Sequence, residues 1–173
     1  RYPNATIYGT PFTINLLKII ASDEKIFMKN KMVEVPEDSS QTIKGKSGTY
    51  QIDFIHATHS TIQCSFLALH SDEGTFFYAL DFKMDDTPVM GNPPNYAKLK
   101  EIGKKGVKVL VVNSLASGSK GRTDSENLAR ERVKKALASV EKDKKSALFV
   151  STFSSQIVRL HSIIEFGRKT GRK

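Results

Sequence analysis

The sequence predicts an α/β fold, and two patterns carry this prediction. Apolar, β-prone runs at 48–57, 65–69 and 75–82 are separated by turn-forming residues, which is typical of strands joined by hairpins. From residue 107 onward the pattern alternates strand, helix, strand, helix, which favours a parallel sheet. A chain of 173 residues with 39% hydrophobic content can bury a core, so we expect a folded protein.

Turn chemistry and hydrophobic periodicity place each element. A first helix is expected at 11–22, because Thr10 is a good N-cap and Pro11 fits the first helical position. The other expected elements are strands at 25–35 and 48–57 with a turn at 36–40 between them, a hairpin at 65–69 and 75–82 with Gly74 at its positive-φ position, a loop at 84–95, a short helix at 96–102, a strand at 107–112, a helix at 125–142 capped by Ser125, a strand at 147–152 and a helix at 155–166.

The charge balance favours an anionic partner. Lys and Arg number 27 against 18 Asp and Glu, a formal net charge of +9, and the excess gathers at 98–108, 134–145 and 168–173. The chain has no Trp, and its Phe and Tyr residues are scattered, so contact with the phosphates of a nucleic acid is expected rather than base stacking. No run is apolar enough for a membrane span, and the single Cys64 excludes an internal disulfide.

His59 and Asp81 are the sharpest candidates for a functional site. His59 follows the strand at 48–57 where the chain leaves the sheet, and Asp81 ends the strand at 75–82. A neutral imidazole is a good zinc ligand, and a carboxylate at the end of an apolar strand is costly to bury unless it meets a cation. A lone histidine in a turn is more often a structural residue. The pair together predicts two metal ligands that meet at one end of the sheet.

The pair also belongs to a series of motifs. In order, these are FIHATHS at 54–60, LDFK at 80–83, KKGVKVL at 104–110, GRTDSE at 121–126 and STFSSQIVR at 151–159. The series resembles the ribonuclease J family of β-CASP nucleases with a metallo-β-lactamase fold, above all its archaeal members. The resemblance implies that 1–113 is part of a metallo-β-lactamase αββα fold without its His-x-His-x-Asp-His box. Residues 114–173 are then the start of a β-CASP α/β domain with a parallel sheet.

The resemblance implies an RNA phosphodiester hydrolase with exonucleolytic or endonucleolytic activity. It further implies two zinc ions, a cytoplasmic location, no membrane and a homodimer in the complete protein. It makes Asp81 the bridging ligand and His59 a terminal ligand, with the ions activating a water for attack on the phosphate. Because the His-x-His-x-Asp-His box is absent and the chain begins at Arg1 rather than Met, we expect a middle fragment that binds metal weakly and is inactive alone.

Two alternatives to this function stay open. One is a β-CASP endonuclease of the cleavage-and-polyadenylation type, and the other is a non-catalytic RNA-binding or scaffold relative. Asn113 supports the second, because the family pattern has an acidic residue at this first β-CASP motif. The pair Ala79-Leu80 and the triplet Thr61-Ile62-Gln63 also depart from the family pattern.

Weaker candidates lie elsewhere in the chain. Ser154 and Ser155, at a predicted strand-to-helix junction, and Arg159, one turn later, are candidates for phosphate or RNA binding, with helix capping as the alternative for the serines. His56 lies an odd number of residues from His59 and is expected to point away from it. His70, in a predicted hairpin turn, and His161, on a basic helix, are expected to be ordinary surface residues.

Overall fold

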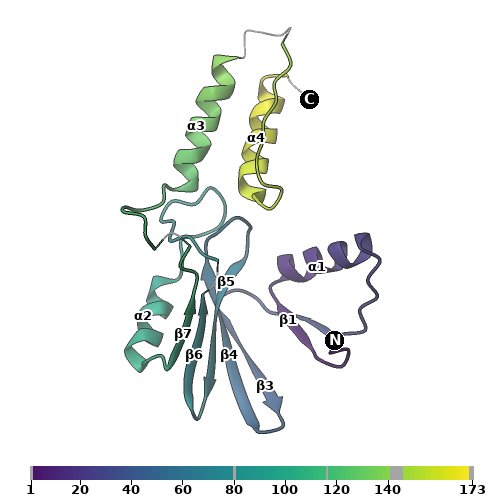
Figure 1. Cartoon of the computed structure of the whole chain (residues 1–173), viewed down its shortest axis with the longest axis vertical. Coiled ribbons are helices and arrows are strands. Elements are labelled where there is room, and N and C mark those ends of the chain that lie inside the picture. Colours follow the sequence, from purple (N-terminus) through teal and green to yellow (C-terminus); the bar gives the residue numbers. More distant parts are fainter. Residues whose placement is uncertain (1, 80, 116, 141–145, 172–173) are drawn as a thin grey trace.

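A five-stranded mixed sheet is the centre of the structure (Figure 1). The computed structural model describes residues 2–79, 81–115, 117–140 and 146–171. The strands are β1 (Ile7–Gly9), β2 (Met32–Glu34), β3 (Ser39–Gly45), β4 (Gly48–Ala57), β5 (Cys64–Ser71), β6 (Gly74–Ala79) and β7 (Val109–Val112), and the helices are α1 (Pro11–Asp23), α2 (Tyr96–Lys105), α3 (Glu126–Ser139) and α4 (Ile157–Lys169). The α/β class expected from the sequence is confirmed.

The central sheet is a β-meander with one parallel strand added. Its order is β3-β4-β5-β6-β7, with antiparallel pairing from β3 to β6 and parallel pairing between β6 and β7. A parallel neighbour needs a crossover connection, and α2 lies in that connection beside β6 and β7 (Figure 1). We call β3 to β7 together with α2 the sheet unit.

The hydrophobic core lies between the sheet and α2. Its buried members are Ile55, Ala57, Phe66, Ala68, Phe77, Ala79 and Ile102, and Phe82 and Leu99 pack against them. The residues on β4 alternate at i and i+2, so they line the sheet face that α2 covers. The rings of Phe66 and Phe82 meet edge to face with centroids 5.5 Å apart, which holds the segment after β6 against the sheet.

Helix α1 lies between β1 and β2, which pair in parallel as a separate two-stranded sheet. Thr10 is its N-cap and Pro11 its first residue, as the sequence predicted, but the Thr10 hydroxyl makes no capping bond within the helix. The cap comes instead from the loop between β4 and β5, where the Gln63 side-chain oxygen accepts from the Phe12 amide at 2.7 Å. Gln63 therefore joins this N-terminal unit to the sheet unit.

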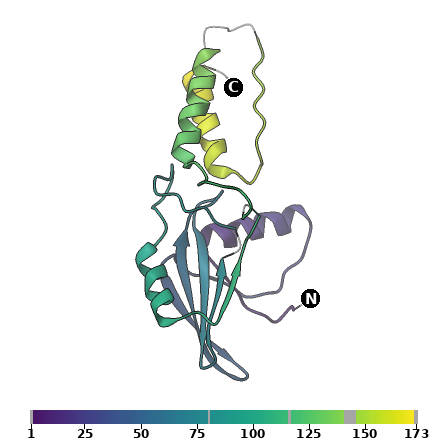
Figure 2. The same ribbon diagram turned by 60° about the vertical axis from the view of Figure 1, so that its left-hand side comes forward.

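Helices α3 and α4 lie side by side beyond one end of the sheet (Figure 2). They run in the same direction, because the start of α4 contacts the start of α3 through Arg159 and Glu126, and Arg130 reaches Ser162 and Glu165 one turn further along each helix. We call α3 and α4 the helix pair. An extended segment at 146–156 leads back to the start of α4 (Figure 2).

Three expected elements differ from the structure. The strand predicted at 25–35 is limited to Met32–Glu34, and β3 begins inside the region predicted as a turn. The strand predicted at 147–152 is wrong, because these residues are extended but pair with no strand in the described part of the chain. An apolar run becomes a strand only beside a hydrogen-bonding neighbour, and Phe149 here is 92% exposed.

Element ends shift by a few residues. Helix α2 continues past Gly103 to Lys105 and ends at Gly106, whose φ of 91° favours glycine. Helix α4 begins at Ile157 rather than 155. Ser125 is confirmed as the N-cap of α3, and Gly74 has the predicted positive φ. Helix α3 ends at Ser139, with Val140 as its C-cap, so the predicted end at 142 is too late. The end of the basic tail at 172–173 lies outside the described residues.

Candidate functional site

Backbone pairing brings His59 and Asp81 to the same end of the sheet. Thr58 and Lys83 form an isolated antiparallel bridge, in which the Lys83 amide donates to the Thr58 carbonyl at 2.7 Å and the Thr58 hydroxyl donates to the Lys83 carbonyl. His59 follows Thr58 directly, and Asp81 precedes Lys83 by two residues. The bridge therefore holds the two predicted ligands on neighbouring segments.

His59 and Asp81 line one open cavity of about 420 Å³. Both are exposed, and Asn113, which follows β7, lines the same cavity. The Asn113 amide nitrogen donates to Asp81 Oδ1 at 2.7 Å, and the Asn113 oxygen accepts from the Leu115 amide at 2.7 Å. Lys83 and Arg122 add positive charge to the cavity wall. Three residues that the sequence singled out thus share one surface with two cations.

These residues do not complete a metal site by themselves. In the described part of the chain, no group of three or more His, Cys, Asp and Glu side chains is arranged to hold a metal ion. Zinc sites in proteins take about four ligands, or three with a water. One oxygen of Asp81 already accepts from an amide, and the other has no hydrogen bond to any described residue. His59 and Asp81 therefore fit as part of a metal site and not as the whole of it.

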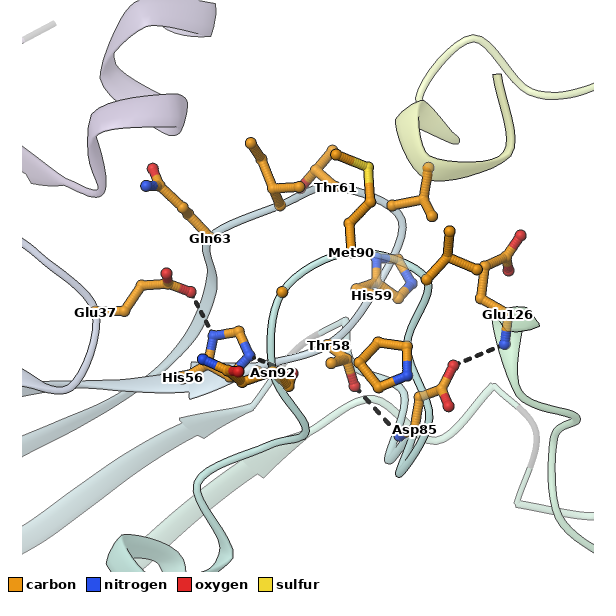
Figure 3. Close-up of a pocket in the computed structure, with 16 residues that line it drawn as sticks. Glu37, His56, Thr58, His59, Thr61, Gln63, Asp85, Met90, Asn92 and Glu126 are labelled. Atoms are coloured by element: carbon orange, nitrogen blue, oxygen red, sulfur yellow. Dashed lines mark hydrogen bonds and ion pairs between the residues drawn. The ribbon is translucent and has the colours of Figure 1, made fainter. Parts of the chain in front are cut away.

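His56 belongs to a different environment from His59. It is buried, and its ring contacts the Glu37 carboxylate through Nδ1 and the Asn92 carbonyl through Nε2 at 2.8 Å (Figure 3). Burial, the largest influence, lowers the pKa of His56, but the bonds to Asn92 and Glu37 outweigh it and raise that pKa above its usual value. Because Nδ1 and Nε2 are both engaged, His56 takes no part in the His59–Asp81 cavity.

A second cavity of about 290 Å³ lies between the sheet unit and the helix pair. Figure 3 shows His56 and Glu37 on one side of it and Asp85 and Glu126 on the other, with His59 between them. Apolar side chains of the 84–95 loop and of α4, among them Met90 and Val158, close the rest of its wall. His59 is therefore shared by both cavities.

An ionic network unites three of the sequence motifs. Lys83 Nζ lies 3.7 Å from Glu126 Oε2 and 3.8 Å from Asp85 Oδ2. Arg159 binds both carboxylate oxygens of Glu126, at 3.0 and 2.9 Å. Asp85 and Glu126 were not among the candidate residues predicted from the sequence. Their signal was present, because Glu126 lies within one motif and Asp85 follows another by two residues.

The predicted phosphate-binding residues do not line the His59–Asp81 cavity. Ser154 and Ser155 are exposed in the turn before α4, and the N-cap is Gln156, which makes no side-chain capping bond. Helix capping by the serines is therefore wrong for this structure. The Arg159 guanidinium is bound to Glu126, so a phosphate would have to compete with a two-bond ion pair.

His70 and His161 have different surroundings. His161 is exposed on α4, as expected. His70 lies in β5 rather than in a turn, and its ring bridges Asp53 Oδ2 at 3.2 Å and the Thr75 hydroxyl at 3.1 Å. Burial acts on Asp53 to raise its pKa, but hydrogen bonds from Ser40, Gln51, His70 and Lys98 lower that pKa to about 2. His70 is thus part of a structural network near the middle of β4.

The basic character of the surface is partly neutralised. On α2, Lys98 pairs with Asp53 at 3.3 Å, and Lys105 pairs with Glu101 at 2.7 Å. The last part of the basic cluster at 134–145, residues 141–145, lies outside the described residues. No helix in the described part of the chain is long and apolar enough to cross a membrane.

Sequence comparison identifies relatives over the whole chain. No protein-family model matches it. The chain is 36% identical over 177 residues to ribonuclease J of Pyrococcus abyssi and 35% identical over 173 residues to that of Methanocaldococcus jannaschii, covering 100% and 99% of this chain. Ribonuclease J of Helicobacter pylori is 32% identical over 167 residues, or 96% of this chain.

The match covers a minor part of each relative. The chain spans 38% of the length of the first two relatives and 23% of the third. The motifs that the sequence analysis connected with this family lie within the matched residues, and the structure brings several of them together around Lys83 and Glu126. By sequence, the chain is similar over nearly its whole length to one segment of proteins named ribonuclease J.

Proposed function

We propose that this chain is part of a metal-dependent RNA phosphodiester hydrolase of the ribonuclease J type, in which His59 and Asp81 supply two of the metal ligands. The observation that carries the proposal is their position on one cavity, beside Lys83 and Arg122. A zinc site here would supply an activated water and neutralise charge on the scissile phosphate. Residues 1–113 would form the metallo-β-lactamase portion and 114–173 the start of the β-CASP domain.

The chain's own residues would hold and orient the substrate. Lys83 and Arg122 place positive charge at the wall where a phosphate of the RNA backbone would approach His59 and Asp81. Asn113 orients the Asp81 carboxylate by donating to Oδ1, and leaves Oδ2 for the metal. The remaining ligands must come from a segment that carries the His-x-His-x-Asp-His box. The cytoplasmic location and the homodimer of the complete protein belong to the same proposal.

The second candidate is a non-catalytic RNA-binding relative. Asn113 favours it, because an amide that donates to Asp81 replaces the acidic residue of the family pattern and removes a negative charge from the cavity. A weaker anionic field would bind the metal ions less tightly and the RNA phosphates more readily. RNA binding without hydrolysis in the presence of zinc, by a chain supplied with the missing ligands, would favour this candidate.

Metal binding is the first test. Zinc is titrated into the purified chain and into His59→Ala and Asp81→Ala variants, with His161→Ala as the control for an exposed histidine outside the cavity. We expect weak binding in the wild type, a loss in both cavity variants and no change in the control. Binding that survives both cavity variants would refute the assignment of the ligands.

Hydrolysis is the second test. The chain is mixed with a separately produced polypeptide that carries a His-x-His-x-Asp-His box, and a labelled RNA is followed with and without zinc. The proposal predicts cleavage that requires both polypeptides, zinc, and intact His59 and Asp81. RNA retention without cleavage would support the non-catalytic alternative.

A further inference from the structure

Asp85 is a buried carboxylate at the junction of three parts of the molecule. Its side chain is 2% exposed. Oδ2 accepts from the Glu126 amide at 2.7 Å (Figure 3). Oδ1 accepts from the Thr87 amide at 3.0 Å. Its own amide donates to the Thr58 hydroxyl at 3.2 Å, next to His59. One residue therefore contacts the end of β4, the 84–95 loop and α3.

The bond to Glu126 is a helix cap supplied from outside the helix. Glu126 is the first residue of α3, and the local N-cap Ser125 uses its hydroxyl to accept from the Asn127 amide at 3.1 Å. The first four amides of a helix have no partner within it, and a carboxylate there also interacts favourably with the helix dipole. Asp85 therefore closes the start of α3 with a group that belongs to the sheet unit.

The same junction extends to α4. Lys83 lies within 4 Å of the carboxylates of both Asp85 and Glu126, and Glu126 binds Arg159 on α4 through two hydrogen bonds. The path from Thr58 to Arg159 thus passes only through buried or partly buried side chains. A buried carboxylate is tolerated only when several donors bind it. Its partners are therefore held in defined positions.

We propose that Asp85 is a positioning residue that holds the helix pair in a defined place relative to His59 and Asp81. The functional importance of this positioning rests on the proposed function, in which His59 and Asp81 are metal ligands. Asp85 and Glu126 lie together on one side of the 290 Å³ cavity, which His59 also lines, and Arg122, four residues before α3, lines the His59–Asp81 cavity. Loss of the Asp85 cap would free the start of α3 and with it the segment that carries Arg122.

Neighbouring contacts across the junction are more exposed. Arg122 binds Asp86 Oδ2 at 2.6 Å, but both side chains are more than half exposed. The hydroxyls of Thr87 and Ser125 also bond at 2.8 Å at an exposed site. Exposed pairs contribute little to the rigidity of a junction. Asp86 therefore provides a matched control, since it lies next to Asp85, is also acidic and also bridges to the segment before α3.

The test measures geometry in the native state. Spin labels at Asp72→Cys on the β5–β6 turn and Lys135→Cys on α3, in a Cys64→Ser background, report the distance distribution between the sheet unit and the helix pair. We expect Asp85→Ala to broaden this distribution, Asp85→Asn to broaden it less, because one oxygen still accepts, and Asp86→Ala to leave it unchanged. Amide exchange at Glu126 should become about tenfold faster in Asp85→Ala.

The outcomes separate positioning from simple stabilisation. A lower unfolding temperature for Asp85→Ala with an unchanged native distance distribution and unchanged Glu126 exchange would overturn the proposal. If Asp85→Ala does not fold, Asp85→Asn carries the same test with a milder change. None of these measurements needs metal or RNA, so failure of zinc binding at His59 and Asp81 would refute the proposed function without affecting this result.

Discussion

The sheet unit and the helix pair differ in how completely each covers its own apolar surface. In the sheet unit, β3 to β6 are joined by short connections, and α2 covers a core that includes Ile55, Phe66 and Ile102. The segments around the helix pair leave Leu115, Phe149 and Phe153 at least 78% exposed. Local hairpins find their partners within the chain, whereas the segment at 147–152 pairs with no strand in the described residues.

This difference teaches where stability and function are expected to separate. The sheet unit has the contacts to fold cooperatively, and it holds His59 and Asp81 at its end. The helix pair is attached mainly by polar contacts through Asp85, Glu126 and Lys83. Substitutions in the two regions should therefore differ in size and in their response to salt and acid.

The largest effect is expected in the sheet core. Phe66→Ala removes a ring that contacts Phe77 and Phe82, and should reduce the free energy of unfolding by about 3–5 kcal/mol. Phe153→Ala, which alters an exposed ring near the helix pair, should change it by less than about 0.5 kcal/mol. Urea unfolding followed by circular dichroism measures both. Equal losses would show that the two regions do not differ in this way.

The second-largest effect on stability is expected from acid, through Asp53. Its pKa of about 2 lies below the value of about 3.9 in an unfolded chain, so its stabilising contribution is present above pH 4 and is lost as the pH falls toward 2. The loss should be about 2 kcal/mol and should be absent in Asp53→Asn, which is already destabilised.

Salt should distinguish the acid dependence of the helix pair from that of the sheet unit. Glu165 in the helix pair also has a pKa lowered to about 2, by Lys169 and Arg130, but it is more exposed than Asp53. High salt should therefore weaken the acid dependence of the helix pair and leave that of the sheet unit largely intact. Amide exchange at several pH and salt values resolves the two regions, and an equal salt response in both would contradict this expectation.

A smaller effect is expected at Gln63. Gln63→Ala removes the cap of α1 and should cost about 1 kcal/mol, with fraying of the first turn of α1. Gln63 has a φ of 56°, so Gln63→Gly removes the same cap but relieves the backbone, and should be less destabilising than Gln63→Ala. Amide exchange at Phe12 reports the cap directly, and unchanged exchange in both variants would show that the bond contributes nothing.

The smallest effect on stability is expected at the candidate site. His59→Ala and Asp81→Asn alter exposed side chains, and each should change the free energy of unfolding by less than about 0.5 kcal/mol. A loss of zinc binding in a variant that is as stable as the wild type would separate function from folding. A large loss of stability would instead make these residues structural.

Local features of the structure were predictable from the sequence. The N-terminal Thr10-Pro11 of α1, the turn at Gly74 and the Ser125 cap depend on residues within a few positions of each other, and each is confirmed. The end of β4 that precedes His59 was also predictable, because alternation of apolar residues indicates where a strand stops, whereas β6 ends at Ala79, before the predicted end at 82. The sequence by itself therefore determined the α/β class, most of the elements and the pair at the end of the sheet.

Other features depended on partners that are distant in the sequence, and only the tertiary structure decided them. β3, which begins in the predicted turn and continues through residues given no strand, forms because β4 pairs with it. Residues 147–152 stay unpaired because no neighbouring strand is present in the described chain. Arg159 binds Glu126, 33 residues away, and Asp85 caps a helix that begins 41 residues later. A strand, an ion pair and an external cap each need a partner that is close in the folded structure, and local sequence patterns do not specify which residue that partner is.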